Sequence, residues 1–408
     1  MHYFLFSLLI SLQSNRLKAD SNIKTQDVES QSLFQMAQTT KALKKILQDY
    51  DKELRPDFAG PPVIVNVTIL VDSLGPISEL ENSFRVDFNI RQAWHDSRLK
   101  YNDNNNNTAS RIALSHEFME KIWIPDSYFP NSLKEEKHCT MVPNVLLRLS
   151  STGDVLFSSR ATVISKCVID LTNYPFDTQS CKLMIETYGY TTDDLFLKWT
   201  HTNPVNVSKQ FDMPRFTFSR HEISEYILSF TTGNFSDLEI KFFLERNLEY
   251  YIIKNYVPAI LVVVFSWCVF WMDSTDLSVR AFLSVTSVLS IVTLMYDVND
   301  DLPKVSKLKA IDYFFIISTL FVFAALFEFA VTSYIDVVHK YYDESNMQPK
   351  QPFVAVLIDL SKTINKTLIK ISPRTIDEYS RRVFPCCYFI SCLIYFGKYA
   401  ALLSGYGT

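Results

Sequence analysis

Glycine is scarce in this 408-residue chain, with eight in total, and no G-x-G-x-x-G or G-x-x-x-x-G-K-[ST] loop is formed. Such loops hold nucleotide phosphates, so we expect no nucleotide-dependent chemistry. The histidines and cysteines form neither H-E-x-x-H nor Cys-x-x-Cys, and we therefore expect no metal site and no cofactor. With 44 acidic against 40 basic residues, the chain also lacks the basic excess of a nucleic-acid-binding protein. These absences argue against a soluble enzyme and against a nucleic-acid partner.

The N-terminus carries a short apolar run. Tyr3–Ile10 has about the length of a signal-peptide core and is too short to cross a bilayer. We therefore predict a signal peptide at about residues 1–18 and an extracellular domain after it; the alternative is a buried N-terminal helix. An extracellular domain would present four N-glycosylation sequons, which begin at Asn66, Asn106, Asn206 and Asn234.

Long apolar segments are concentrated in the C-terminal part of the chain. Asn255–Met272 carries no charge and is long enough to span a lipid bilayer. The Lys and Arg residues of 335–382 predict a short cytoplasmic loop, because positive charge is retained on the cytoplasmic side, and both termini are then extracellular. The succession of segments predicts transmembrane helices at 250–272, 279–297, 310–334 and 383–404.

The part of the chain before these segments reads as an extracellular domain at residues 30–246. Phe84–Arg91 alternates between apolar and polar residues, which is typical of a strand with one buried face. Val145–Leu149 and Asp154–Phe157 flank a turn and predict a hairpin. Many short strands at close spacing predict an all-β sandwich. The predicted fold class is therefore an extracellular all-β sandwich followed by a four-helix transmembrane bundle.

Two cysteines enclose the most specific motif of the chain. Cys167 and Cys181 bracket a segment that contains Tyr174-Pro175-Phe176-Asp177. This segment resembles the defining loop of the Cys-loop receptors, the pentameric ligand-gated ion channels, and the details are most similar to the GABA and glycine receptor branch. Further matches are Trp123–Asp126, Glu186–Tyr190, Leu244–Arg246 and Leu302–Ser306.

The resemblance implies an assembly and a mechanism of coupling. It implies a homo- or hetero-pentamer with other receptor subunits in the plasma membrane, at a postsynaptic site, and a disulfide between Cys167 and Cys181. In the family the loop faces the connector after the second span and transmits binding to gating. The coupling residues implied here are Tyr174, Pro175, Phe176, Asp177, Arg246 and Lys304.

The resemblance also implies a transmitter site between neighbouring subunits, for a small amino acid or amine. On the principal face, aromatic rings would hold the ammonium group, with Glu186 as a carboxylate partner. On the complementary face, Arg91 would bind the agonist's carboxylate through charge-assisted hydrogen bonds, and the alternation of its strand also puts it on the polar face. The implied ligand residues are Tyr128, Glu186, Tyr188, Phe230, Thr232 and Phe235 on the first face, and Arg91, Arg148 and Ser158 on the second.

The second span is unusually rich in Ser and Thr for a lipid-facing helix, which predicts that it lines the pore. With 3.6 residues per helical turn, the residues named below form one stripe along this span, and the resemblance puts the stripe on the channel axis. The alternative interpretation of the stripe is a contact between helices. The predicted pore-lining residues are Phe282, Thr286, Leu289, Thr293 and Asp300, with Leu289 as the apolar gate.

Charge selectivity is predicted from the inner end of this span. Val279 occupies the position where cation channels of the family carry Glu, and Arg280 would form a positive ring, so we expect chloride to permeate. Asp300 would attract cations at the outer mouth, which keeps a cation-selective channel as an alternative. A further alternative is a non-conducting partner subunit. It stays open because Phe282 is bulky and because Asn89 stands where the ligand box usually has an aromatic residue.

Overall fold

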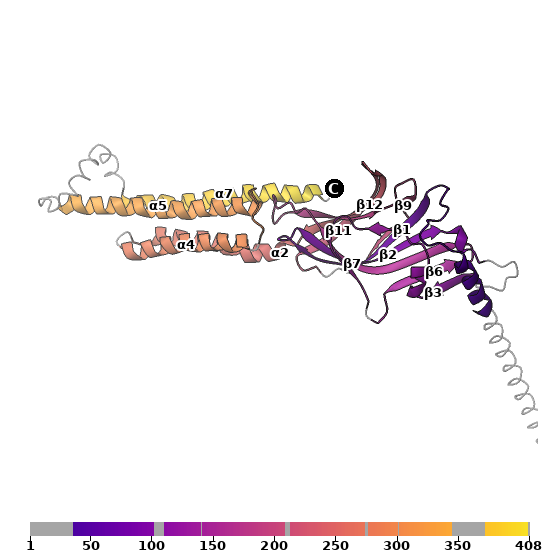
Figure 1. Cartoon of the computed structure of the whole chain (residues 1–408). Coiled ribbons are helices and arrows are strands. Elements are labelled where there is room, and N and C mark those ends of the chain that lie inside the picture. The colour runs from indigo at the N-terminus through magenta and orange to yellow at the C-terminus, as the bar shows by residue number, and fades with distance from the viewer. Residues whose placement is uncertain are drawn as a thin grey trace, which may run out of the picture.

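A computed structural model describes residues 36–101, 110–139, 141–208, 213–273, 276–300, 302–344 and 372–406. In it, a domain of β-strands is followed by long helices that extend away from one end of that domain (Figure 1). The predicted signal peptide, the Asn106 sequon and the central part of the predicted cytoplasmic loop lie outside the described residues.

Two sheets form the sandwich. The residues of β1 and β2 are alternately buried, as the apolar and polar alternation of their sequences requires. Their inward side chains form the core together with those of the second sheet, including Val67, Leu183 and Leu238, all without solvent exposure. The larger sheet has the order β10 (Val205–Val207), β1 (Val63–Ser78), β2 (Ser83–His95), β7 (Asp154–Lys166), β6 (Val145–Ser150) and β3 (Arg111–Leu114), with β5 (Ser132–Lys137) beside β7 and β9 (Leu195–Trp199) beside β1. The smaller sheet has the order β11 (Phe216–Phe230), β12 (Gly233–Arg246), β8 (Thr178–Thr187) and β4 (Ser127–Tyr128).

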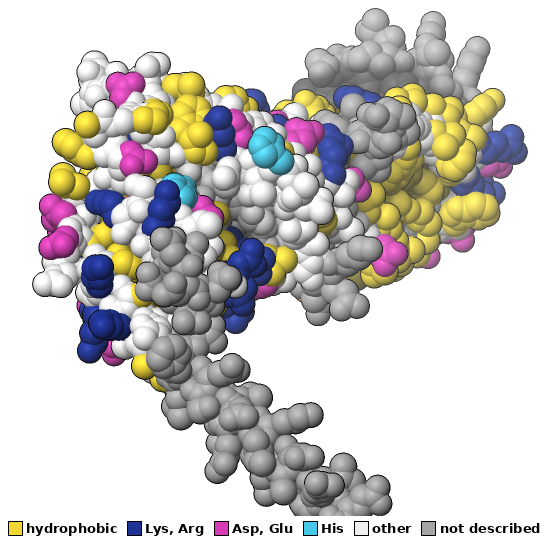
Figure 2. Space-filling model, turned by 90° about the vertical axis from the view of Figure 1, so that its right-hand side faces the viewer, with side chains coloured by type: hydrophobic (Ala, Val, Ile, Leu, Met, Phe, Trp, Pro, Cys, Tyr) yellow, Lys and Arg dark blue, Asp and Glu magenta, His cyan; other side chains and the backbone are white. Residues whose placement is uncertain are grey.

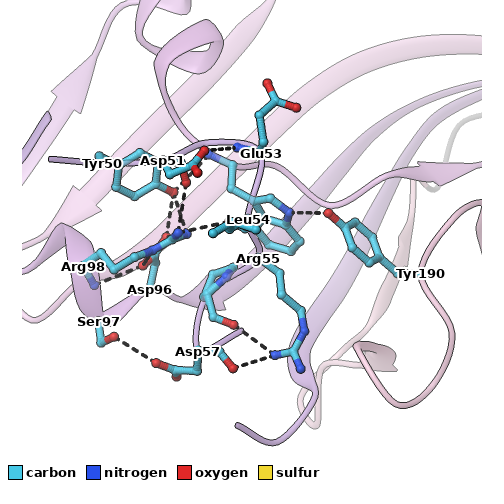
Figure 3. Close-up of polar contacts among 12 residues, drawn as sticks. Tyr50, Asp51, Glu53, Leu54, Arg55, Asp57, Asp96, Ser97, Arg98 and Tyr190 are labelled. Carbon is cyan, nitrogen blue, oxygen red and sulfur yellow. Dashed lines mark hydrogen bonds and ion pairs between the residues drawn. The ribbon is translucent and has the colours of Figure 1, made fainter. Parts of the chain in front are cut away.

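A buried charge ties the segment before β1 to the end of β2 (Figure 3). Asp96 has no solvent exposure and accepts hydrogen bonds from the hydroxyl of Tyr50 at 2.7 Å and from Nε and Nη2 of Arg98 at 2.9 and 2.8 Å. Arg98 also donates to the backbone carbonyls of Asp51 and Leu54. A buried carboxylate is stable only with such partners, so this cluster holds the segment in place.

Within the described residues, four helical stretches are long and apolar enough to cross a membrane. In Figure 2, charged side chains are scattered over one part of the molecule, whereas another part presents a nearly continuous hydrophobic surface. The predicted fold class, a β-sandwich followed by a four-helix transmembrane bundle, is confirmed. The first span joins α2 (Leu248–Tyr251), a π-helical turn η3 (Ile252–Tyr256), α3 (Val257–Ser266) and the 3-10 turn η4 (Trp267–Trp271); the others are α4 (Leu277–Asp300), α5 (Ala310–Glu344) and α7 (Pro373–Tyr406).

The helices extend beyond the spans expected from hydropathy. The third helix continues to Glu344, and the fourth begins at Pro373, so both enter the segment 335–382 that the sequence assigns to the cytoplasmic loop. Hydropathy reports only the apolar part of a helix, whereas the backbone stays helical through its polar end. Proline is well suited to the first helical position, where its missing N–H leaves no hydrogen bond unmade.

Candidate functional site

Three of the predicted principal-face residues come together on the smaller sheet. Tyr128 on β4 pairs with Glu186 on β8, and its hydroxyl donates a hydrogen bond to Glu186 Oε2 at 3.1 Å. The ring of Tyr188 lies 5.3 Å from that of Tyr128, almost perpendicular to it, and is 76% exposed. The cluster therefore combines a buried carboxylate with two aromatic rings, one of them open to solvent, an arrangement that suits an organic cation.

A second carboxylate, which the sequence analysis did not identify, extends this cluster. Asp237 on β12 pairs with Glu186 across the sheet, so the two side chains lie on the same face. Burial raises the pKa of Glu186, and burial followed by the charges of Glu186 and Glu239 raises the pKa of Asp237 to about 7. Burial and the nearby Glu186 charge raise the pKa of Tyr128 to about 12. Negative charge is therefore costly in this cluster unless a positive group is bound.

The hairpin between β11 and β12 carries the other predicted principal-face residues. Phe230 and Gly233 pair at its end, and Gly233 has φ +137°, a conformation that a side chain would strain. Thr232 and Phe230 are exposed in and beside the turn, whereas Phe235 is buried and packs against Phe230 at a ring distance of 5.8 Å. Phe230 is thus the ring presented to solvent, and Phe235 supports it.

The predicted complementary residues share a face of the larger sheet. Arg91 on β2 pairs with Ser158 on β7, and Arg148 on β6 pairs with Leu156, two positions earlier on β7. Both arginines are exposed, and neither forms an ion pair within the described parts of the chain. Tyr128 and Glu186 belong to the other sheet, so the two predicted sets of ligand residues lie on different sheets of the chain.

The described sequon residues lie on the surface of the sandwich or close to it. Asn206 and Asn234 are exposed, and Asn66 is half-buried. The side-chain oxygen of Asn234 accepts a hydrogen bond from Ser229 across the hairpin at 2.7 Å. Asn66 also lines a pocket of about 620 Å³, together with Arg148.

The predicted disulfide between Cys167 and Cys181 is present. The loop that it closes reaches a buried arginine at the end of β12. Nε and Nη2 of Arg246 donate to the two oxygens of Asp177 at 2.7 and 3.0 Å, and Nη1 donates to Glu79 at 2.8 Å and to the hydroxyl of Tyr251 at 3.0 Å. The guanidinium is fully buried, so these acceptors offset the cost of removing its charge from water.

The same loop contacts two membrane helices. The carbonyls of Thr172 and Tyr174 accept hydrogen bonds from the amides of Ala310 and Ile311, both at 3.0 Å, where α5 begins and its first amides have no partner within the helix. The ring of Phe176 stacks on Tyr399 of α7 at 5.2 Å. The loop therefore joins the β domain to the bundle directly.

The connector after the second span also carries basic residues near the loop. Lys304, one of the predicted coupling residues, is exposed and forms no ion pair with any described residue of the loop. Lys307 instead lies close enough to Asp170 of the loop to lower the pKa of that carboxyl, after the effect of hydrogen bonds from Thr172. Lys307, three residues after Lys304, is thus the basic residue of the connector that acts on Asp170.

The exposed face of α4 matches the predicted pore stripe. Phe282 and Leu289 are 67% and 65% exposed, Thr293 and Asp300 are also exposed, and Thr286 is half-buried. The opposite face, buried within the chain, is formed by Arg280, Ser284, Ser287, Ile291 and Val298. The stripe is therefore the face of this helix that its own subunit leaves uncovered.

The position of Arg280 corrects the sequence prediction that it presents a free positive charge at the inner end of this stripe. Its side chain is 1% exposed, and Nη2 donates to Asp377 of α7 at 2.7 Å. Glu328 of α5 lies close enough to interact with both groups. The arginine turns inward because a buried carboxylate from a distant helix can neutralise it there, whereas Val279 is uncharged and 44% exposed.

Comparison with known proteins agrees with this geometry. The sequence model described as neurotransmitter-gated ion-channel ligand binding domain matches residues 39–248, and the one described as neurotransmitter-gated ion-channel transmembrane region matches residues 255–365. A similar protein is the gamma-aminobutyric acid receptor subunit beta-4 of Gallus gallus, 36% identical over 308 residues, which are 75% of this chain. The match spans 62% of the length of that relative. The resemblance found in the sequence is thus confirmed, and the chain, a multi-pass membrane protein, belongs to the neurotransmitter-gated ion-channel family.

Proposed function

We propose that this protein is a subunit of a channel that opens when a small amino-acid or amine transmitter binds between two neighbouring subunits. The observation that carries the proposal is the division of the ligand residues between two sheets. Glu186 with its tyrosines would receive the cationic end of a ligand, and the exposed Arg91 of the next subunit would receive an anionic end. The relative is named for gamma-aminobutyric acid, which has both ends.

The uncovered stripe of α4 supports a pore built from several copies of that helix. One polar helix cannot enclose a water-filled path in a membrane, so a ring of subunits is needed, and we propose five. The subunit would lie in the plasma membrane of a postsynaptic cell, with both termini outside. Mass measurement of the detergent-extracted complex tests the assembly, and a stable monomer or dimer would contradict it.

We propose chloride as the permeating ion. Val279 brings no carboxylate to the inner end of α4, and the amide end of a helix dipole is positive. A cation channel is a second candidate, because Arg280 is already neutralised by Asp377 and because Asp300 is exposed at the other end of the helix. The two candidates differ in which ion gradient sets the reversal potential.

Whole-cell recording from cells that express the chain, with a panel of amino-acid and amine transmitters, tests the function. We expect a current that reverses at the chloride equilibrium potential. Val279→Glu should shift permeability toward cations, whereas Val279→Gln, of similar size without the charge, should not. A reversal potential that follows sodium in the unmutated channel would favour the cation candidate, and the absence of any transmitter-gated current would contradict the function proposed for this chain alone.

A further inference from the structure

The carboxylate of Asp237 is buried without a partner. The residue is 1% exposed, and neither oxygen accepts a hydrogen bond from any described residue. Buried polar groups in folded proteins are almost always hydrogen-bonded, and an unpartnered carboxylate is among the most costly exceptions. The missing donor must therefore come from outside the described chain.

The groups that face Asp237 cannot supply that donor. Glu186 on β8 and Glu239 on β12 are carboxylates themselves and oppose its ionisation. Lys182 on β8 donates to Glu239 at 2.8 Å, and the hydroxyl of Tyr128 on β4 donates to Glu186 at 3.1 Å. These two donors are thus committed to the two other carboxylates. Tyr226 on β11 pairs with Asp237 across the hairpin, but its hydroxyl donates to neither oxygen of that carboxylate, so Asp237 remains available.

The chemistry of the cluster selects one class of ligand. A primary ammonium group has three N–H donors, so it can donate to Asp237 and Glu186 together while Tyr188 covers it with an aromatic face. A quaternary ammonium group has no N–H and would leave Asp237 unpartnered. A calcium ion takes six to eight oxygen ligands, more than these two side chains offer.

We propose that Asp237 and Glu186 together form an ammonium subsite, and that the ligand of this receptor carries a primary ammonium group. The inference rests on the proposed function, since it assigns the subsite to the transmitter. It adds to the aromatic cluster a second carboxylate, which specifies N–H donors and not positive charge alone. The neighbouring subunit is not needed for this half of the recognition, because both carboxylates belong to one sheet of one chain.

The test measures binding to the purified, detergent-solubilised chain by ligand-induced thermal stabilisation. The probes are 4-aminobutyrate, n-butylamine, and the N,N,N-trimethyl derivative of 4-aminobutyrate. We expect the primary amines to bind and Asp237→Asn to weaken them by about 10- to 100-fold, as for other charged hydrogen bonds. The trimethyl derivative should bind more weakly than 4-aminobutyrate, and Asp237→Asn should change its affinity by less than about threefold.

Two controls separate the alternatives. Glu239→Gln changes a carboxylate on the same strand that is already paired with Lys182, and it should leave primary-amine affinity within about threefold. Asp237→Ala provides a second variant without the carboxylate, should Asp237→Asn fail to assemble. Absence of binding by either primary amine, or equal binding by unmutated and Asp237→Asn chains, would overturn the inference. If Asp237→Asn gives transmitter-gated currents with unchanged sensitivity, the ammonium subsite is wrong and the proposed function stands. If binding depends on Asp237 but no current is found, the subsite stands and the proposed function is wrong.

Discussion

An Asp177→Asn substitution removes the charge that faces both Nε and Nη2 of Arg246 and keeps the size of the side chain. The arginine is fully buried, so it cannot recover the lost interaction from water. Removing one partner of a buried pair costs about 3–5 kcal/mol. Glu79 and Tyr251 still hold Nη1, so we expect the lower end of this range, about 3 kcal/mol, which is roughly a 100-fold change in the unfolding equilibrium.

This cost is large enough to measure by heating. For a domain of about 200 residues, 3 kcal/mol lowers the melting midpoint by on the order of 10 °C. The assay is size-exclusion chromatography of the detergent-solubilised complex after heating, together with biotinylation of the protein at the cell surface. Glu245→Gln is the matched control, because it changes an exposed carboxylate next to Arg246 on the same strand.

The reasoning also predicts how two substitutions combine. Arg246→Gln leaves Asp177 buried without a cation and leaves Glu79 with Arg215 alone, at 3.8 Å. Adding Asp177→Asn to it should restore part of the lost stability, because the Asp177–Arg246 pair acts as a unit. If Asp177→Asn lowers the midpoint no more than Glu245→Gln does, or if the double variant shows the full sum of the single losses, this account of Arg246 is wrong.

Three further predictions concern other buried groups. Asp377→Asn leaves Arg280 without its hydrogen-bonded carboxylate and should lower the melting midpoint of the complex, whereas Glu378→Gln, at an exposed position one residue later, should not; equal midpoints would contradict the pairing. The pKa of Asp237 is raised from its ordinary 3.8 to about 7, so between these pH values the folded chain holds a proton on this carboxyl that the unfolded chain loses. The stability gained by binding this proton is therefore complete below about pH 4 and is lost as pH rises through about 7. Asp237→Asn should therefore be more stable than the unmutated chain at about pH 8 and lose that advantage near pH 5, as thermal melts at both pH values can show; a difference independent of pH would contradict this. Cys167→Ser removes the disulfide, which typically costs about 2–5 kcal/mol, and should abolish surface expression; normal surface levels and currents would refute the importance of the bond.

The periodicity of apolar residues predicted individual strands and helices and the face that each one buries. The alternation of Phe84–Arg91 corresponds to a strand with one buried face, and the stripe through Phe282 and Leu289 corresponds to the uncovered face of α4. Such patterns are visible because the spacing of residues along a strand or helix decides which face they share. The motif around Tyr174 and Asp177 predicted the disulfide and the environment of Arg246 for a different reason, namely resemblance.

Long-range partners were beyond the sequence. Arg280 occupies the expected position in the second span, but its direction depends on Asp377, 97 residues away in α7, and no local pattern indicates that pairing. Asp237 lies one position beyond the Asn234 sequon and fits the polar and apolar alternation of its strand, so its significance comes only from the strand register with Glu186. In both cases a charged side chain takes its role from a residue on another element, so only the assembled fold reveals it.

The stacking of Phe176 on Tyr399 has a consequence for the lipid that surrounds the protein. The helix that carries Tyr399 exposes large apolar side chains, including Leu393 and Ile394, which acyl chains would cover in a membrane. Whatever displaces this helix from the bundle also takes the rings of Tyr395 and Tyr399 away from Phe176. The disulfide-closed loop is therefore linked through Phe176 to two rings of the helix that exposes these side chains, Tyr395 and Tyr399, and its stiffness should vary with the thickness and packing of the lipid around α7.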